Sequence, residues 1–349
     1  MKYDWKNSLI KPESLLRDAL LILEREPLRA TLVVDDKCRL LGIVTDGDIR
    51  RGLIQDFHMD SPVKDVMNRE PLTAPIGTAR NEVVKMMESN QFVCIPILKG
   101  KVVVGLETLQ TPGELSTHDN PVFIMAGGFG KRLRPLTENC PKPMLKLGGK
   151  PVLEILLTKF IASGFKNFYI STHYLPEVIQ DYFGDGSAWN VKITYVHEMS
   201  PLGTGGALGL LPDNIPDLPL VLINGDVLTN LDFEKVLQFH NKNKAAATMC
   251  VKNHEYQVPF GVINIDDNKV VSMIEKPTHR FMINAGVYIV GQNIIRAVEK
   301  NIPIDMPALL ERHIAIGEDV LTFPIHEYWL DIGRLDDYAR AQSDILTIG

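Results

Sequence analysis

Hydrophobic and polar residues in the first third of the chain follow one pattern that occurs twice. An apolar spacing typical of a helix at 15–23 is followed by an apolar run at 31–34, a polar turn, and a second apolar run at 40–44. The same order of helix, strand, turn and strand recurs at 83–87, 93–98 and 102–106. Each copy is too small to bury its own apolar face. We therefore expect the copies, at about residues 8–57 and 62–111, to pack on one another.

Short apolar runs alternate with helical stretches in the rest of the chain. The apolar runs lie at 122–125, 167–171, 191–195 and 220–223, and the helical stretches at 152–162, 176–182 and 233–240. Such alternation predicts an α/β domain with a mostly parallel sheet, whose ligands bind at the carboxyl ends of the strands. We therefore divide the chain into an N-terminal domain at 1–112, a linker at 113–121 rich in turn-forming residues, and a C-terminal domain at 122–349.

The composition is ordinary for a globular protein and excludes several classes. The 349 residues are 45% hydrophobic, and 37 basic against 43 acidic side chains leave a net charge of −6. A nucleic-acid-binding protein would carry a basic surplus, and the sequence shows neither a membrane span nor the apolar stretch of a signal peptide. The four cysteines have no metal-binding or disulfide-like spacing. We expect a cytoplasmic protein with reduced thiols and without a nucleic-acid or membrane partner.

The motif Gly42-Ile43-Val44-Thr45-Asp46-Gly47-Asp48 closes the first copy of the N-terminal repeat. The repeat resembles a tandem CBS (Bateman) module, an α+β unit. This resemblance implies that Thr45 and Asp48 bind the phosphate and ribose of a nucleotide, with an adenine nucleotide as the candidate ligand. In the second copy Thr111 replaces the aspartate, so that half lacks the full signature. A pair kept for packing or dimerisation is the open alternative, and since CBS pairs often associate we expect a homo-oligomer.

A glycine-rich loop follows the first apolar run of the C-terminal domain. It comprises Ala126, Gly127, Gly128, Phe129 and Gly130, and the cations Lys131 and Arg132 come next. Glycines let the backbone approach a polyphosphate, whose oxygens accept hydrogen bonds from backbone N–H groups and from arginine. The spacing fits neither a Walker A loop nor a Rossmann fingerprint. Arg132 stands where the first requires Ser or Thr, and Leu133 where the second requires glycine.

Two further motifs follow this loop, Pro141-Lys142-Pro143-Met144 and Gly148-Gly149-Lys150-Pro151. Together with the loop they resemble the signature of sugar-1-phosphate nucleotidyltransferases, apart from Lys131, which stands where the family usually has threonine. The resemblance implies a Rossmann-like catalytic domain with a mixed, mostly parallel sheet. The implied reaction is nucleotidyl transfer. A phosphate oxygen of the sugar 1-phosphate attacks the α-phosphorus of a nucleoside triphosphate, and pyrophosphate leaves.

The resemblance also implies roles for residues that occur in family order. Asp226 and Asp331 are the expected ligands of Mg²⁺, a hard cation that prefers oxygen. Arg132 is expected to hold the β- and γ-phosphates, and Lys142 to bridge the two reacting phosphates. The expected nucleotide-binding residues are Ala126, Gly127, Gly128, Gly130, Lys131, Glu198, Gly203 and Thr204, and the expected sugar-phosphate-binding residues are Gly261, Glu275, Lys276 and Asn284.

Structural roles are the open alternatives for several of these residues. Asp226 also fits a helix N-cap, Asp331 a turn, Lys142 an exposed loop charge, and Glu198 a solvated charge at the end of a strand. A carboxylate only accepts hydrogen bonds, and guanine offers adjacent N1–H and N2–H₂ donors, whereas uracil and thymine offer one N–H between carbonyls. If Glu198 contacts the base, the sequence therefore favours GTP, with UTP and CTP as alternatives.

The combination of a CBS pair with this catalytic domain is similar to the CBS-containing glucosamine-1-phosphate guanylyltransferases of nonulosonic (legionaminic) acid synthesis. It favours glucosamine-1-phosphate as the acceptor. A mannose-1-phosphate guanylyltransferase is the first alternative, and a uridylyl- or cytidylyltransferase the next. The alternative outside the enzymes is a catalytically silent regulatory subunit that senses nucleotides through its CBS pair. Against it, Asp226, Asp331, Arg132 and Lys142 are all present.

Overall fold

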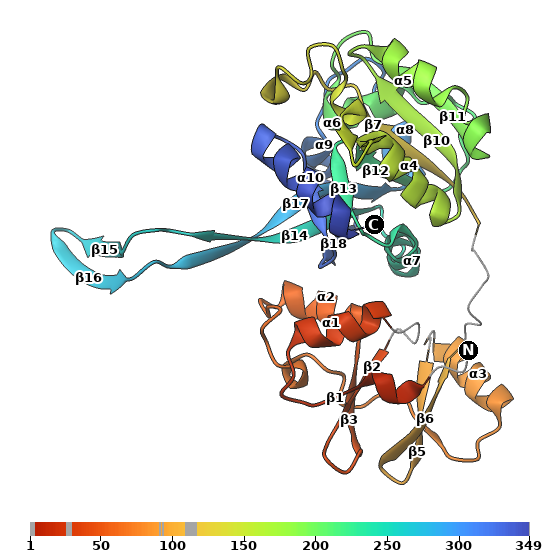
Figure 1. The fold of residues 1–349 in the computed structure, drawn as a ribbon, viewed down its shortest axis with the longest axis vertical. Coiled ribbons are helices and arrows are strands. Elements are labelled where there is room, and N and C mark those ends of the chain that lie inside the picture. Colours follow the sequence, from red (N-terminus) through yellow and green to blue (C-terminus); the bar gives the residue numbers. More distant parts are fainter. Residues whose placement is uncertain (1–3, 26–29, 91, 93, 109–116, 349) are drawn as a thin grey trace. The chain divides into compact units, whose positions relative to one another are not determined.

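The computed structural model describes residues 4–25, 30–90, 92, 94–108 and 117–348. The chain divides into two compact units, Met1–Glu114 and Leu115–Gly349 (Figure 1). No helix among the described residues is long and apolar enough to cross a lipid bilayer.

The first unit contains the two copies of the repeat. The first copy consists of β1 (Leu9–Ile10), α1 (Leu16–Arg25), β2 (Ala30–Val34), β3 (Leu40–Thr45) and α2 (Asp46–Ile54). The second consists of β4 (Ala74–Pro75), α3 (Arg80–Asn90), β5 (Cys94–Lys99) and β6 (Val102–Thr108). Short 3₁₀ helices, η1 (Trp5–Ser8) and η2 (Val63–Asp65), precede and follow the first copy. In both copies the first strand runs parallel to the second and the third antiparallel to it.

The two copies pack on one another, as the pattern predicts. Leu32 and Ile43 of the first copy share one buried core with Cys94 and Val103 of the second. A backbone contact joins the hairpin turns as well, because the N–H of Val103 donates to the carbonyl of Cys38 at 3.0 Å. The apolar face that one copy leaves uncovered is therefore buried by the other.

A seven-stranded sheet forms the centre of the second unit, in the order β11-β10-β7-β12-β17-β14-β18. Its strands are β7 (His118–Met125), β10 (Phe165–Thr172), β11 (Lys192–His197), β12 (Leu220–Asn224), β14 (Ala247–Gln257), β17 (Thr278–Val290) and β18 (Val320–Ile325). Among these described strands only β17 runs antiparallel to its neighbours. The predicted mixed, mostly parallel α/β sheet is therefore confirmed.

The predicted linker at 113–121 is wrong for residues 118–121, which begin strand β7. His118 lies opposite Phe165 of β10, and the backbone hydrogen bonds of this pairing outweigh the turn preference of the polar residues. Residues 113–116 of the predicted linker lie outside the described part of the chain.

Helices cover both faces of the sheet because side chains alternate in direction along each strand. Val122 and Ile124 belong to a core that includes residues of α4 (Val152–Ala162), α5 (Pro176–Phe183) and α7 (Phe233–Asn243). Phe123 belongs to a second core, with residues of α8 (Gln292–Arg296) and α9 (Met306–Ala315). The unit therefore has three layers, and the strand ends are the part of the sheet that remains available to ligands.

Shorter elements connect these layers. They are η3 (Lys131–Leu133), η4 (Lys142–Met144), β8 (Lys146–Leu147), β9 (Lys150–Pro151), η5 (Ser187–Trp189), α6 (Gly203–Gly206), η6 (Ala207–Leu210), β13 (Val227–Thr229), β19 (Trp329–Asp331) and α10 (Leu335–Ile348). Strands β8 and β9 form a hairpin, and β13 pairs with β19.

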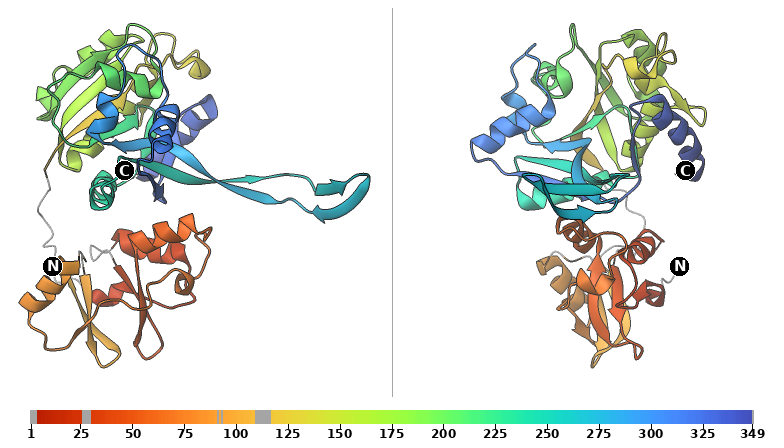
Figure 2. Two further views of the ribbon diagram at one scale, coloured as in Figure 1. Left: turned by 180° about the vertical axis from the view of Figure 1, so that it is seen from behind. Right: turned by 90° about the vertical axis from the view of Figure 1, so that its left-hand side faces the viewer.

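Strands β14 and β17 continue beyond the sheet as a two-stranded ribbon, which no part of the sequence pattern predicted. The ribbon leads into a hairpin of β15 (Val262–Asp266) and β16 (Lys269–Ile274). Figure 1 and the left view of Figure 2 show it projecting from the second unit. Residues 253–282 are called the arm below.

Candidate functional site

The carboxyl ends of β7 and β12 bring the glycine loop next to Asp226. Met125 of β7 lies opposite Asn224 of β12, and Gly225 donates its N–H to the Met125 carbonyl at 2.8 Å. A Cβ on Gly225 would lie 2.7 Å from that carbonyl oxygen, so the close approach requires glycine. Strand β13 begins at Val227, directly after Asp226, and the alternative of a helix N-cap for Asp226 is therefore wrong.

A two-stranded ladder brings Asp331 beside Asp226. Val227 of β13 lies opposite Asp331 of β19, and the N–H of Ile332 donates to the Asp226 carbonyl at 3.1 Å. Because Asp226 precedes Val227, the two carboxylates meet at the same end of this ladder.

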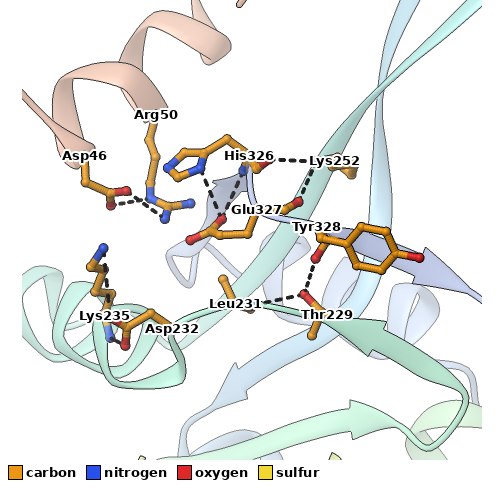
Figure 3. A network of polar contacts seen from close by, with 10 residues as sticks. All are labelled: Asp46, Arg50, Thr229, Leu231, Asp232, Lys235, Lys252, His326, Glu327 and Tyr328. Atoms are coloured by element: carbon orange, nitrogen blue, oxygen red, sulfur yellow. Dashed lines mark hydrogen bonds and ion pairs between the residues drawn. The ribbon is translucent and has the colours of Figure 1, made fainter. Parts of the chain in front are cut away.

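The segment that precedes β19 is held by polar contacts to neighbouring strands, which Figure 3 draws. Lys252 of β14 donates from Nζ to the Glu327 carbonyl at 2.8 Å. Thr229 of β13 donates from its hydroxyl to the Tyr328 carbonyl at 2.8 Å. These contacts fix the position at which β19 begins, and so the position of Asp331.

Lys142 joins the two aspartates. Its side chain is only 12% exposed, and its Nζ forms an ion pair with Asp226 and lies 4.0 Å from Asp331 Oδ1. A Cβ on Gly130 would lie 3.1 Å from Lys142 Cβ, which places the lysine against the glycine loop. The alternative of an exposed loop charge is therefore wrong for Lys142.

The electrostatics of this cluster suit a bound cation. The Oδ1 atom of Asp226 is buried and has no hydrogen-bond partner among the described residues, which is costly unless a ligand completes the site. Burial, together with the charge of Asp226, raises the pKa of Asp331, while Lys142 and Arg132 act in the opposite direction. Two neighbouring carboxylates of this kind fit a hard divalent cation that prefers oxygen ligands.

The glycine loop leaves part of its backbone accessible. Gly130 has φ 61°, in the left-handed region, and its carbonyl accepts a hydrogen bond from Thr137 Oγ1 at 2.8 Å. A Cβ on Gly128 would meet no atom within 4 Å, so a ligand can approach the backbone there. Arg132 is exposed in η3 after the loop, and its positive charge acts to lower the pKa of the Asp331 carboxyl.

Phe129 anchors the glycine loop, a role that the glycine spacing did not indicate. Its ring meets the ring of His173 edge-on at a centroid distance of 5.1 Å, and the ring of Tyr174 at 5.7 Å. Lys131 Nζ lies 5.2 Å from the Phe129 centroid, a cation–π geometry. The ammonium group of Lys131 therefore contacts the loop itself, and its contact with a nucleotide stays a prediction.

Glu198 is buried beside the glycine loop, with 6% of its surface exposed, so the alternative of a solvated charge is wrong. Its Oε2 accepts the N–H of Leu202 at 3.1 Å. Its backbone carbonyl lies 2.6 Å from Nδ1 of His173, a residue that the sequence motifs did not single out. A Cβ on Gly127 would lie 2.8 Å from Glu198 Oε1, so this second carboxylate oxygen faces the loop.

The loop that contains Gly203 and Thr204 is attached to the start of α9 through Asp305. Asp305 Oδ1 accepts the N–H of Thr204 at 2.9 Å, and the Thr204 hydroxyl accepts the N–H of Met306 at 2.8 Å. Gly203 has φ 76°, and a Cβ there would lie 2.7 Å from Asp305 Oδ1. Asp305 was missed in the sequence, although an acidic residue shortly before Pro307 is typical of a helix start.

Asn284 lies where the ribbon leaves the sheet, close to the strand end that precedes Asp226. Its Oδ1 accepts the N–H of Gly286 at 3.0 Å. A Cβ on Gly286 would lie 2.5 Å from Nδ2 of Asn224, the last residue of β12. Of the four residues expected to bind the sugar phosphate, Asn284 is thus the one that the structure brings near the carboxylate cluster.

The other three, Gly261, Glu275 and Lys276, are exposed residues of the arm. They lie beyond the last pair of the β14–β17 ladder, Gln257 opposite Thr278. A Cβ on Gly261 would lie 3.0 Å from Glu275 Oε2, so two of the three are close to one another. The structure does not bring them to the carboxylate cluster of their own chain, and their role in sugar binding stays a prediction.

Thr45 and Asp48 form a capping box at the N-terminus of α2 in the first unit. The N–H of Thr45 donates to Asp48 Oδ2 at 2.8 Å, and the N–H of Asp48 donates to Thr45 Oγ1 at 3.4 Å. Arg51 forms an ion pair with the other Asp48 oxygen. Both residues therefore have a structural role, and their contact with a nucleotide stays a prediction. Thr111 lies outside the described residues.

A separate pocket of about 310 Å³ is lined by residues of η6, α8 and the segments around them. Its two cations are already paired, Arg296 with Asp217 at 2.8 Å and Lys300 with Asp213 at 3.8 Å. None of the predicted site residues lines this pocket. The glycine loop with the carboxylate cluster therefore remains the candidate site.

Family models match both units. The nucleotidyl transferase model matches residues 122–348, and the CBS domain model matches residues 7–55 and 63–106. The first match covers more than half of the chain. The chain therefore belongs to the nucleotidyl transferase family, and its N-terminal part contains two CBS domains.

Similar proteins carry the names of guanylyltransferases. The chain is 35% identical over 243 residues to the mannose-1-phosphate guanylyltransferase of Mycobacterium tuberculosis, a match that covers 66% of each chain. It is 32% identical over 225 residues to the D-glycero-α-D-manno-heptose 1-phosphate guanylyltransferase of Aneurinibacillus thermoaerophilus, covering 64% of this chain and 97% of that one. The chain thus spans about two thirds of the length of the mycobacterial relative.

The fold also resembles a solved structure, that of HddC from Yersinia pseudotuberculosis in complex with GMP-PN. The TM-score is 0.52 at 28% sequence identity, and the match covers 65% of this chain and 99% of that chain.

Proposed function

We propose that this protein is a sugar-1-phosphate guanylyltransferase, which transfers a guanylyl group from GTP to a sugar 1-phosphate. The observation that carries the proposal is the cluster of Lys142, Asp226 and Asp331 beside the glycine loop. Membership of the nucleotidyl transferase family and relatives named as guanylyltransferases support it.

The residues of the site would overcome the repulsion between two phosphate groups. A bond forms between a phosphate oxygen of the sugar and the α-phosphorus, while the bond from the α-phosphorus to the β-phosphate oxygen breaks and pyrophosphate leaves. The nucleophile is already an anion, so the reaction needs no general base. Lys142 would neutralise the reacting phosphates, and Arg132 with the amides of the loop Gly127–Gly130 would bind the departing pyrophosphate. The N–H of Ala126 is not among these donors, because it donates to the Ser171 carbonyl at 3.1 Å.

Asp226 and Asp331 are the proposed ligands of the metal ion. A divalent metal is typical of this family, and such an ion neutralises the charge that develops on phosphate oxygens. We assign Mg²⁺ because carboxylate and phosphate oxygens are its usual ligands. Lys142 already contacts both carboxylates, so the ammonium group and a bound ion would share the negative charge of the pair.

Glu198 is the proposed determinant of base specificity, with Gly203 and Thr204 bordering the base. One carboxylate oxygen is held by Leu202 and the other faces Gly127 of the phosphate loop. Such a carboxylate accepts hydrogen bonds from N1–H and N2–H₂ of guanine and repels a carbonyl oxygen in the same position. The fold neighbour solved with GMP-PN supports a guanine nucleotide.

The acceptor is proposed to be a sugar 1-phosphate. The domain combination favours glucosamine-1-phosphate, as in nonulosonic acid synthesis, whereas the relatives are named for mannose-1-phosphate and a manno-heptose 1-phosphate. These compounds are therefore the first to test. The product would be a GDP-sugar for nucleotide-sugar biosynthesis. We propose a cytoplasmic enzyme, and the CBS pair is the reason to expect a homo-oligomer.

The first test is pyrophosphate release with Mg²⁺ over a grid of four nucleoside triphosphates and these sugar 1-phosphates. We expect activity with GTP, and we expect Glu198→Gln to lower kcat/KM for GTP by about 10- to 100-fold, since the amide presents an N–H group to the donors of guanine. The variant keeps an oxygen for the Leu202 N–H, and Glu177→Gln at an exposed position of α5 is the matched control.

Other outcomes of the grid would change specific parts of the proposal. Activity with UTP or CTP in place of GTP would reject the role of Glu198 and retain nucleotidyl transfer. Silence of the folded protein over the whole grid, with adenine nucleotides added, would favour a regulatory subunit.

The CBS pair is proposed to bind an adenine nucleotide at Thr45 and Asp48. Calorimetry of the full chain with AMP, ADP and ATP should detect binding, and Asp48→Asn should weaken it at least about tenfold because one charged acceptor for the ribose is lost. Asparagine is chosen because its oxygen can still cap α2. Absence of binding to the wild-type chain would leave packing as the role of the pair.

A further inference from the structure

The arm exposes an unusual amount of apolar surface. Ten large apolar side chains on it are 40–72% exposed, namely Tyr256, Phe260, Ile263, Ile265, Val270, Val271, Met273, Ile274, Phe281 and Met282. Together they present an apolar area on the order of 1,000 Å². The largest apolar patch of a typical monomer is about 300–600 Å², whereas one partner of a stable complex contributes about 800 Å². The arm therefore has the surface of an interface.

The backbone of the arm also lacks neighbours. In strand β14, only Ala247–Lys252 pair with β18. In strand β17, only residues 287–290 pair with β12. Beyond these residues the outer edges of the ribbon have no strand partner among the described residues. A two-stranded ribbon by itself is marginally stable in water, and unpaired edges readily associate with another chain.

The charge of the arm indicates which partner fits. Between residues 253 and 282 the acidic residues are Glu255, Asp266, Asp267 and Glu275, and the basic residues are Lys269, Lys276 and Arg280, so four negative charges oppose three positive ones. This near-neutral, apolar surface does not suit nucleic acid or an anionic membrane, both of which select basic residues. It suits a permanent protein interface. Two copies of the arm can pack together because the electrostatic repulsion between their small net charges is weak.

We propose that the arm is the surface through which two copies of this chain form a two-fold symmetric dimer, and that each arm supplies Glu275 and Lys276 to the site of the partner. The second part rests on the proposed function. The ladder is continuous from Val251 opposite Asn284 to Gln257 opposite Thr278. Thr278 therefore lies about 20 Å further along the ribbon than Asn284, and Lys276 follows beyond the end of the ladder. A lysine side chain does not span that distance, so Lys276 of a straight arm acts in another copy.

The molar mass of the full chain, measured by light scattering during size-exclusion chromatography, tests the interface. We expect twice the 39.1 kDa mass of one chain, and Ile265→Glu should raise the dissociation constant at least about tenfold by placing a charge in an apolar contact. Ile316→Glu, which changes an isoleucine of similar exposure outside the arm (73% against 65%), is the matched control and should leave the mass unchanged.

A shortened chain makes this test decisive. Val258 already donates its N–H to the Pro277 carbonyl at 3.0 Å, so residues 259–276 can be replaced by an Asn-Gly turn that closes the ribbon. We expect this variant to be a monomer, with slightly less than half the wild-type mass. A monomeric wild-type chain at micromolar concentration, or a shortened chain that keeps the wild-type mass, would overturn the proposal.

Mixing two inactive variants tests whether the arms act across the interface. In a mixed dimer of Asp226→Asn and Lys276→Ala chains, an arm that acts on the partner gives one complete site, which combines Asp226 of one chain with Lys276 of the other. About half of the dimers in an equal mixture are mixed, and each has one of its two sites complete. The mixture should therefore regain up to about a quarter of wild-type turnover. Arms that act on their own chain leave no complete site, and a mixture as inactive as its components would reject this part. If the wild-type chain shows no transfer at all, the proposed function fails, while the mass measurement still decides the interface.

Discussion

Asp226→Asn is expected to lower turnover at least about 100-fold while the protein stays folded. The substitution removes the negative charge of a proposed metal ligand next to Lys142, and losing one preorganised charge at a phosphoryl-transfer site has an effect of this size. The fold should persist because the variant keeps the backbone carbonyl that accepts the N–H of Ile332, and asparagine keeps a side-chain oxygen that can accept a hydrogen bond from Lys142. Steady-state kinetics and circular dichroism on the same preparation measure both quantities.

A matched control separates loss of the site from a general effect of charge. Asp213→Asn makes the same chemical change at a side chain that is 96% exposed and paired only with Lys300 at 3.8 Å, and we expect wild-type kinetics. Calorimetry with Mn²⁺ adds a readout that does not depend on turnover, since Asp226→Asn should weaken metal binding. An Asp226→Asn enzyme with wild-type kcat/KM would refute the metal assignment.

Lys142→Gln is expected to lower kcat about 100-fold and to destabilise the metal-free protein. Lys142 is the cation that separates two neighbouring carboxylates in a largely buried position, and its removal leaves their charges unneutralised. We expect the free energy of unfolding to fall by about 2 kcal/mol. For a unit of this size, that change corresponds to a decrease in Tm of about 4–8 °C. Thermal melts in the presence of a chelator measure this decrease.

Added Mg²⁺ provides the diagnostic comparison for this variant. A bound cation takes over the neutralising role of Lys142, so the difference in Tm between wild type and Lys142→Gln should become smaller as Mg²⁺ is added. The kinetic loss should remain because the phosphates still lack the ammonium group. Lys300→Gln changes a lysine outside the site that is 67% exposed and 3.8 Å from Asp213, and it should leave both measurements unchanged. A Lys142→Gln protein with wild-type kcat and Tm would show that Lys142 has neither role.

Much of the fold was predictable because the relevant signals are local. The periodicity of a helix or strand is visible in a few consecutive residues, and the same pattern of apolar positions occurs twice in the first unit. The glycine loop and the motif around Lys142 are close in sequence, and the structure accordingly brings Lys142 against Gly130. Local patterns of this kind identify the class of protein even without a structure.

Other features depend on pairings between distant segments, which local patterns do not encode. The turn-forming residues 118–121 predict a linker, but pairing with β10 makes them part of a strand. From its place at the end of a strand, Glu198 could be a solvated charge, but the segment through Leu202 and the glycine loop bury its side chain. Asp305 has no motif of its own and matters because Thr204 lies beside it.

The sequence by itself determined the two-part organisation, the mostly parallel α/β sheet and the order of candidate residues, because apolar periodicity and glycine spacing are properties of short segments. Only the tertiary structure decided that the β13–β19 ladder places Asp331 beside Asp226 and that the arm extends away from the sheet. Both results depend on which strands pair and in which register. Register is set by the burial of whole strand faces and not by any single motif.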